Sequence, residues 1–163
     1  FDITIYPVMC LWGFPTEEYR VPQDDEIMQT LNLVGSDKLM YEEETNTLTL
    51  RDGMAIDFGG IAKGYTSSKL MDIFRKYGVS SAMVSLGGNV QVLGAKTDGS
   101  DWRVAVQNPD GTDDYLGILA IKDKAVITSG GYERYFEEDG KIYHHIMDNE
   151  TGRLGFDIRY DYQ

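Results

Sequence analysis

The feature that most limits the possible folds of this chain is a succession of short strand-like segments between residues 80 and 148. Short turns separate most of these segments, and such turns join antiparallel neighbours, because a parallel pair needs a crossover of a dozen or more residues. The segments read SSAMVSL, VQVLGA, WRVAVQ, LGILAIK, AVITS and KIYHHIMD. The first of them is expected to be buried, and together they predict a largely antiparallel sheet.

Only two helices are predicted. Residues 24–35 begin with acidic side chains that suit the positive end of a helix dipole, and Gly35 suits a C-terminal cap. The second helix, residues 61–77, closes at Gly78 and has an apolar face formed by Leu70, Ile73, Phe74 and Tyr77. Long helices covering a largely antiparallel sheet indicate an α+β fold rather than a doubly wound one.

The N-terminal part is predicted to contain further strands. The opening stretch FDITIYPV alternates as a strand does, and residues 38–53 read as a β-hairpin that turns at Thr45 and Asn46. A short strand is expected over residues 54–57. Cys10 is expected to be a small core residue.

Composition sets the class of protein. With 163 residues and 42% hydrophobic content, the chain suits a single domain over residues 1–163. Its formal net charge of −12 argues against nucleic-acid binding, which needs lysine and arginine to displace counterions. One cysteine excludes an internal disulfide framework, and no apolar stretch approaches the roughly 18–20 residues that span a bilayer.

The stretch IDFGGIAKGY places Asp57, Gly59 and Gly60 directly before a predicted helix. Unpaired N–H groups at a helix N-terminus favour an anion, and Lys63 adds a full positive charge. The stretch matches neither a Walker loop nor G-x-G-x-x-G. An ordinary strand-to-helix turn capped by Asp57 is the alternative.

Two more glycine pairs follow strand-like segments. SLGGN is either a tight turn or a binding loop with Asn89 as its polar anchor. In ITSGGYERYF, the hydroxyls of Thr128 and Ser129 could donate to phosphate oxygens, and Tyr132 and Tyr135 could stack on a ring system. The alternative for this second loop is a polar hairpin turn followed by an edge strand.

The two histidines are adjacent, in YHHIMDNETG. Neighbouring side chains of a strand point to opposite faces, so His144 and His145 cannot both bind one metal, and at most one faces a site. Signatures of a nucleophile elbow, C-x-x-C or H-E-x-x-H are missing. The residues alone therefore predict a cofactor or nucleotide site, with Mg²⁺ supplying positive charge that an acidic protein lacks.

In this order, the motifs resemble those of the ApbE family of FAD:protein FMN transferases. The matching pieces are FDITIYPVMCLWGF, IDFGGIAKGY, SLGGN, ITSGGYERYF and YHHIMDNETGRLG. The resemblance implies a T-fold-like α+β architecture and an enzyme that uses FAD and Mg²⁺. Such an enzyme transfers FMN to a threonine hydroxyl of a target protein and releases AMP, and some members hydrolyse FAD instead.

The resemblance also implies roles for residues of this chain. Asp57 would be a polar contact of FAD, the carbonyl of Gly60 a metal ligand, and His145 the catalytic assistant, either as a general base toward the threonine or as a phosphate-holding group. The remaining predicted FAD contacts are Phe1, Asp2, Ile3, Lys63, Asn89, Thr128 and Ser129.

Other implications concern what lies outside the 163 residues. The family's side-chain metal ligands, an Asp and a nearby Thr or Ser, are expected after Gln163, and an aromatic residue that packs on FAD is expected upstream. These residues alone are therefore expected to bind Mg²⁺ poorly and to transfer FMN slowly or not at all. An FAD-binding module without chemistry is the alternative.

The resemblance further implies a partner and a location. The expected targets are subunits of membrane redox complexes that carry a Ser/Thr-Gly-Ala-Ser/Thr-type motif. The expected location is the extracytoplasmic face of a bacterial inner membrane, as a lipoprotein.

Overall fold

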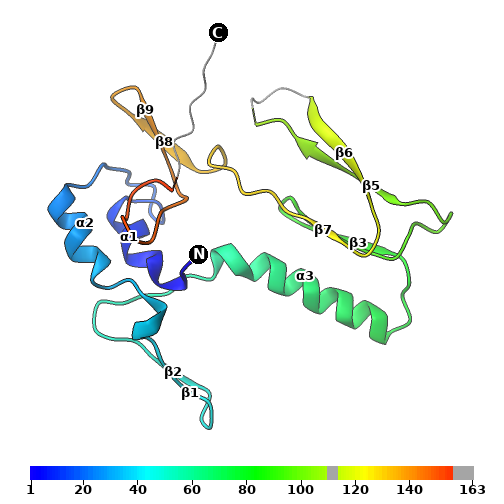
Figure 1. The fold of residues 1–163 in the computed structure, drawn as a ribbon, viewed down its shortest axis with the longest axis horizontal. Helices are drawn as coiled ribbons and strands as arrows, with labels where there is room; N and C mark the ends of the chain where they lie inside the picture. The colour runs from blue at the N-terminus through cyan, green and yellow to red at the C-terminus, as the bar shows by residue number, and fades with distance from the viewer. Residues whose placement is uncertain (110–113, 156–163) are drawn as a thin grey trace. The chain divides into compact units, whose positions relative to one another are not determined.

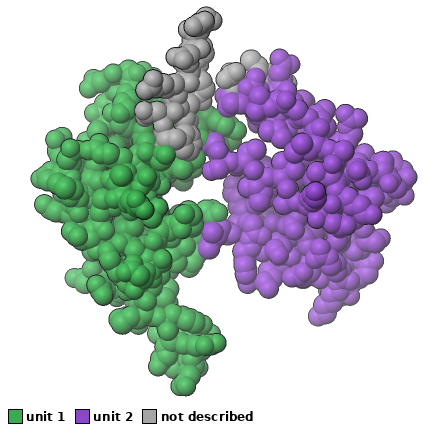
Figure 2. Space-filling model, in the orientation of Figure 1, with its two compact units in different colours: residues 1–60, 131–163 green, residues 61–130 purple. Residues whose placement is uncertain are grey.

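The structure is a computed structural model that describes residues 1–109 and 114–155 (Figure 1). The chain forms two compact units, coloured separately in Figure 2. Unit 1 comprises residues 1–60 and 131–163, and unit 2 comprises residues 61–130. Gln163, after which further metal ligands are expected, lies outside the described residues, and the single-domain expectation stays a prediction.

The elements of unit 1 come from both ends of the chain (Figure 1). They are η1 (Ile3–Ile5), α1 (Tyr6–Leu11), α2 (Asp24–Leu31), η2 (Ser36–Lys38), β1 (Met40–Glu42), β2 (Thr47–Thr49), β8 (Tyr135–Glu138) and β9 (Lys141–His144). Helix α3 (Gly59–Lys76) begins in unit 1 and continues into unit 2. Unit 2 also holds β3 (Ala82–Leu86), β4 (Asn89–Leu93), β5 (Trp102–Gln107), β6 (Tyr115–Ile121) and β7 (Ala125–Val126).

The α+β class and antiparallel pairing are confirmed. Among the described residues, every ladder is antiparallel, and the ladders form four small sheets: β1-β2, β3-β4-β7, β5-β6 and β8-β9. The predicted hairpin turn at Thr45 and Asn46 is present, with Asn46 at φ 52°. Gly78 also ends α3 as predicted, at φ 75°, with the N–H of Val79 donating to the carbonyl of Phe74 (2.9 Å) in a Schellman cap.

The N-terminal segment is helical, so the strand predicted for FDITIYPV is wrong. Oδ1 of Asp2 accepts from the backbone N–H of Thr4 (2.9 Å) and caps η1, and a proline stands at the start of α1. The buried residues Ile5, Val8 and Trp12 recur at the helical spacing of three and four. Cys10 falls on the opposite face and is exposed, so its predicted place in the core is also wrong.

Three further predictions fail locally. The first predicted helix ends at Leu31. Gly35, at φ 140°, is the N-cap of η2, so it does not cap the C-terminus of that first helix. Residues 54–57 form no strand; the N–H of Asp57 donates to the carbonyl of Ile3 (2.8 Å), and no ladder continues from that bond.

The third failure is the inward face of α3. Ser67 and Met71 are buried, whereas Ile73 and Tyr77 are 48% and 77% exposed. Leu70 and Phe74 are half-buried as predicted, so this failure is partial: the inward face is turned by less than one residue from the predicted one.

The core of unit 1 ties the first 35 residues to the β8-β9 hairpin. It contains Ile5, Val8, Trp12, Phe14, Ile27, Val34 and Phe136. The indole Nε1 of Trp12 donates to the carbonyl of Gly152 (3.0 Å), across 140 residues of sequence. Hairpin β8-β9 turns at Asp139 and Gly140, both at positive φ, as a two-residue type I′ turn requires.

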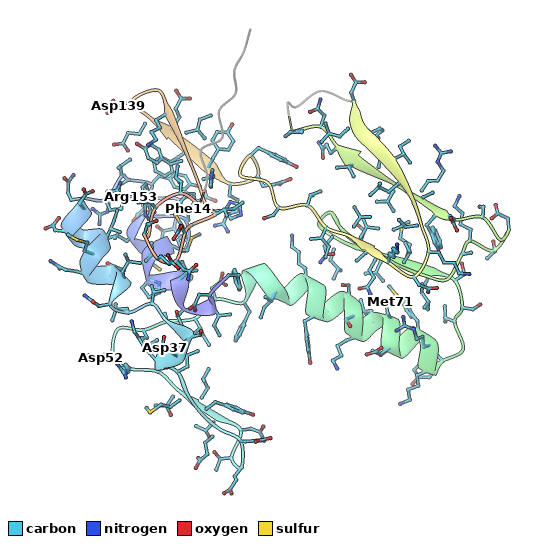
Figure 3. All side chains as sticks on the ribbon, in the orientation of Figure 1. Phe14, Asp37, Asp52, Met71, Asp139 and Arg153 are labelled. Carbon is cyan, nitrogen blue, oxygen red and sulfur yellow. The ribbon has the colours of Figure 1, made fainter. Side chains whose placement is uncertain are left out.

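The core of unit 2 lies on one face of its strands. Val92, Val104 and Ile121 are buried together, with Val90, Trp102 and Val126 packed against them. Met71 of α3, labelled in Figure 3, is 1% exposed. Strand β3, expected to be buried, alternates between half-buried and exposed residues, so it is covered on one face only. No helix in the described ranges is long and apolar enough to cross a membrane.

Candidate functional site

In unit 1, the first residues of the chain lie against the start of α3. The Asp57 N–H donates to Ile3, and Oδ1 of Asp57 accepts from the Gly59 N–H (3.1 Å). A Cβ at Gly60 would lie 2.4 Å from Cε2 of Phe1, so glycine lets the Phe1 ring lie against the helix. Of the residues predicted to bind FAD or metal, the structure therefore brings together Phe1, Ile3, Asp57 and Gly60.

Asp2 lies between Phe1 and Ile3 in the sequence, but its carboxylate already accepts hydrogen bonds from other residues of the fold. Oδ1 accepts from Thr4, and Oδ2 accepts from the backbone N–H of Ser36 (3.0 Å). Partial burial alone would raise the pKa of Asp2, but these hydrogen bonds outweigh it and lower the pKa below its ordinary value. The carboxylate therefore ties the N-terminus to η2, and its contact with FAD stays a prediction.

In unit 2, the glycine turn between β3 and β4 lies beside a cation. Gly87 and Gly88 have φ of 56° and 83°, which favour glycine. The ammonium of Lys63, on α3, donates to the carbonyl of Gly87 (3.4 Å). The part of α3 that carries Lys63 and the glycine turn before Asn89 therefore lie side by side, with Lys63 exposed and able to turn its charge toward a ligand.

Asn89, the first residue of β4, has a buried amide group that could bind a ligand. It is 6% exposed, and its Oδ1 has no hydrogen-bond partner among the described residues. A buried amide oxygen left without a donor costs about 1–3 kcal/mol, so such groups usually find one. The side chain fits a ligand that offers an N–H or O–H group.

Thr128 and Ser129 follow β7, and both are exposed. Strand β7 pairs with β4 in the register Val90↔Val126. Continued by two residues, this register would set Thr128 opposite Gly88, at the same end of the sheet as Asn89. The pairing itself ends at Val126, so a contact of Thr128 or Ser129 with the other predicted residues of unit 2 stays a prediction.

His145 lies in unit 1, directly after β9. Its neighbour His144 is fully buried, as expected for adjacent residues that face opposite ways, and Nδ1 of His144 accepts from the N–H of Ile146 (3.2 Å). The ring of His145 is half-buried and meets the ring of Phe14 edge-on, with centroids 6.4 Å apart. Figure 3 labels Phe14 next to the β8-β9 hairpin. His145 is thus the histidine available for chemistry.

The surroundings of His145 favour its neutral form. Burial lowers the pKa of the imidazole below 6.5, and the electrostatic influence of Arg134 and of His144 acts in the same direction. The hydrogen bond to the Arg134 backbone and the charge of Glu133 oppose this shift without cancelling it. A neutral imidazole at pH 7 can accept a proton, which suits a general base.

The described part of the chain supplies too few ligands for the predicted magnesium site. Within the described residues, no three His, Cys, Asp or Glu side chains gather closely enough to hold a metal ion. Gly60 lies in the first turn of α3, where a carbonyl already serves the helical ladder and has one lone pair left. The described residues therefore do not complete a magnesium site.

Sequence reasoning missed the two neighbours of His145, Arg134 and Phe14. The guanidinium of Arg134 donates to the carbonyl of Phe14 (2.8 Å), and its own carbonyl lies 3.1 Å from Nδ1 of His145. The Asp139–Gly140 dipeptide is a strong hairpin signal. Counting outward from it sets Arg134 opposite His145, so this signal could have found Arg134.

Similarity to known proteins covers nearly the whole chain. The sequence model described as "ApbE family" matches residues 1–154. A Klebsiella pneumoniae protein named FAD:protein FMN transferase is 37% identical over 154 residues, covering 93% of this chain and 47% of that protein.

Solved structures agree in fold. The crystal structure of the ApbE protein from Thermotoga maritima superposes with a TM-score of 0.87 at 36% identity, covering 94% of this chain and 50% of that one. The apo form of the Pseudomonas stutzeri flavinyl transferase ApbE gives a TM-score of 0.79 at 34% identity, covering 94% and 48%. The chain spans about half the length of the relatives that it matches.

Proposed function

This chain belongs to the ApbE family, and we propose that the whole protein transfers the FMN moiety of FAD to a threonine hydroxyl of a target flavoprotein, releasing AMP. The observation that carries the proposal from the site itself is the buried amide oxygen of Asn89, which has no described partner and lies two residues after Gly87, whose carbonyl accepts from the ammonium of Lys63. FAD could donate a hydroxyl or N–H group to the amide oxygen of Asn89, and its diphosphate could accept from the ammonium of Lys63.

In the proposed reaction, His145 takes the proton of the threonine hydroxyl as its oxygen attacks the FMN phosphorus. The new phosphorus–oxygen bond forms as the bond to the AMP phosphate breaks, and AMP leaves with the electron pair. Mg²⁺, when bound, supplies positive charge that offsets the charge of the diphosphate. We place its side-chain ligands beyond the described residues.

The test is a mass measurement on a target peptide. The whole protein is incubated with FAD, Mg²⁺ and a peptide carrying a Ser/Thr-Gly-Ala-Ser/Thr-type motif with an acceptor threonine. We expect the peptide to gain the mass of FMN minus water, to gain nothing when EDTA removes the metal, and to gain nothing when valine replaces the threonine. AMP released without a peptide would indicate FAD hydrolysis, and FAD binding without product would indicate a binding module.

Replacing Lys63 with methionine is expected to weaken FAD binding by roughly 10–100-fold. The change removes one charge-assisted contact with the diphosphate, worth about 1.5–3 kcal/mol. Titration calorimetry with FAD measures the Kd. Lys69→Met is the matched control, because Lys69 is on the same helix and its ammonium lies over the ring of Tyr65. Equal losses in the two variants would remove Lys63 from the site.

The partner and location remain part of this proposal. Family resemblance favours a membrane redox subunit as target and the extracytoplasmic face of a bacterial inner membrane as the place of action. Labelling of the protein by a membrane-impermeant reagent on intact cells would test the location.

A further inference from the structure

The catalytic candidate and two neighbouring residues of unit 1 each contact the other two. The guanidinium of Arg134 donates to the Phe14 carbonyl, and the Phe14 ring packs edge-on against the ring of His145. The carbonyl of Arg134 accepts from the backbone N–H of His145 and lies 3.1 Å from its Nδ1. Each residue therefore holds the other two.

The contact at Nδ1 determines the tautomer of His145. A carbonyl oxygen can only accept, so Nδ1 must carry the hydrogen that it donates to Arg134. In the neutral ring, Nε2 is then left with its lone pair. The other nitrogen is thus the only one able to take a proton from a substrate.

The position of the carbonyl depends on the side chain of the same residue. Arg134 lies just beyond the end of the β8-β9 ladder, whose first pair is Tyr135↔His144. Its guanidinium reaches across 120 residues of sequence to the segment after α1. Together with the backbone hydrogen bond from His145, this bond fixes the backbone of Arg134 just beyond the end of the ladder.

We propose that Arg134 is a positioning residue for His145: its side chain, bonded to Phe14, holds its own carbonyl where it fixes His145 in the Nδ1–H tautomer with Nε2 as the base. This inference rests on the proposed function for its catalytic consequence, and on the contacts above for the orientation of the ring.

Charge acts beside geometry at this site. The charged or titratable groups that influence His145 are Arg134, His144 and Glu133. Removing the positive charge of Arg134 would ease protonation of the ring, whereas losing the hydrogen bond at Nδ1 would hinder it. The pKa of His145 alone therefore cannot separate the loss of the charge from the loss of the hydrogen bond. The tautomer of the neutral ring can, because only the hydrogen bond at Nδ1 fixes it.

The experiment is ¹⁵N NMR of histidine-labelled whole protein, with His145→Gln used to assign the signal, together with steady-state kinetics. In the wild type, we expect Nδ1–H to be the major neutral form. In Arg134→Met, we expect that form to lose its majority and kcat to fall at least about tenfold, with the KM for FAD within about twofold. Arg134→Lys should restore part of both, because an ammonium can also donate to Phe14.

Arg20→Met is the matched control. Arg20 likewise donates to a backbone carbonyl, that of Leu11 (3.1 Å), and pairs with Glu26, but has no described contact with His145. We expect its histidine spectrum and kcat to match the wild type.

The outcomes separate this inference from the proposed function. Nε2–H as the major wild-type form would overturn the inference, and that measurement requires no substitution of Arg134. A folded Arg134→Met protein with unchanged tautomer and kcat would also overturn it. An intact Nδ1–H preference combined with full activity of His145→Ala would instead reject His145 as the base, while leaving the orientation by Arg134 supported.

Discussion

Replacing His145 with alanine in the whole protein is expected to lower kcat for FMN transfer by roughly 10²–10⁴-fold, the range typical of a lost general base. The Kd for FAD should change little, because the described hydrogen bonds and ring contacts of His145 go to Phe14 and Arg134. Single-turnover kinetics on the target peptide measure the first quantity, and calorimetry measures the second.

His144 offers a contrast from the adjacent position. It is fully buried, so His144→Ala should lower the free energy of unfolding rather than kcat per folded molecule. If His145→Ala instead kept full kcat and lost only FAD affinity, the histidine would be a binding group and the base would have to be sought elsewhere.

The rate should also depend on pH through His145. Because burial lowers its pKa below 6.5, the neutral, proton-accepting form predominates at pH 7. As pH falls through the lowered pKa, the ring is protonated and kcat declines. The acid limb of the kcat profile should therefore have an apparent pKa under 6.5, and this limb should vanish in His145→Ala.

Replacing Trp12 with alanine is expected to destabilise unit 1 by about 3–5 kcal/mol, as for other large aromatic deletions in cores. Trp12 is 2% exposed and packs against Phe136 and Tyr143, with ring centroids 6.5 and 5.5 Å away. The change also leaves the carbonyl of Gly152 without its donor. Urea unfolding of the whole protein, followed by circular dichroism, measures the loss.

Trp12→Phe separates packing from hydrogen bonding. It keeps an aromatic ring but removes the donor to Gly152, so about 1–3 kcal/mol of the loss should remain. A Trp12→Ala loss under about 1 kcal/mol would mean that the segment 1–14 does not hold the β8-β9 hairpin. In that case the contact between Phe14 and His145 would not be fixed either.

Much of the local structure was predictable because local rules decide it. Turn residues and period-two alternation placed the strand pairs β3-β4 and β5-β6, and Gly78 marked the end of α3. The errors arose where short patterns fit two structures. FDITIYPV alternates like a strand but also carries an aspartate cap and a helix-starting proline, and these prevail once Val8 and Trp12 find a core.

The candidate site, like the fold, was only partly predictable from the sequence. The residues themselves pointed to Lys63 and Asn89 as candidates, because glycine pairs and polar residues at strand ends are visible locally, whereas the choice of His145 over His144 came from the family resemblance. It also determined the antiparallel character of the fold, since connections too short for a crossover allow nothing else.

Only the tertiary structure decided which polar groups are already used and which are free. It turned Asp2 into a cap, left the buried oxygen of Asn89 without a described partner, and joined Arg134 to Phe14 across 120 residues. Such contacts depend on how the whole chain packs. Closing so long a loop costs conformational entropy, and the burial of the core, rather than one hydrogen bond, offsets that cost.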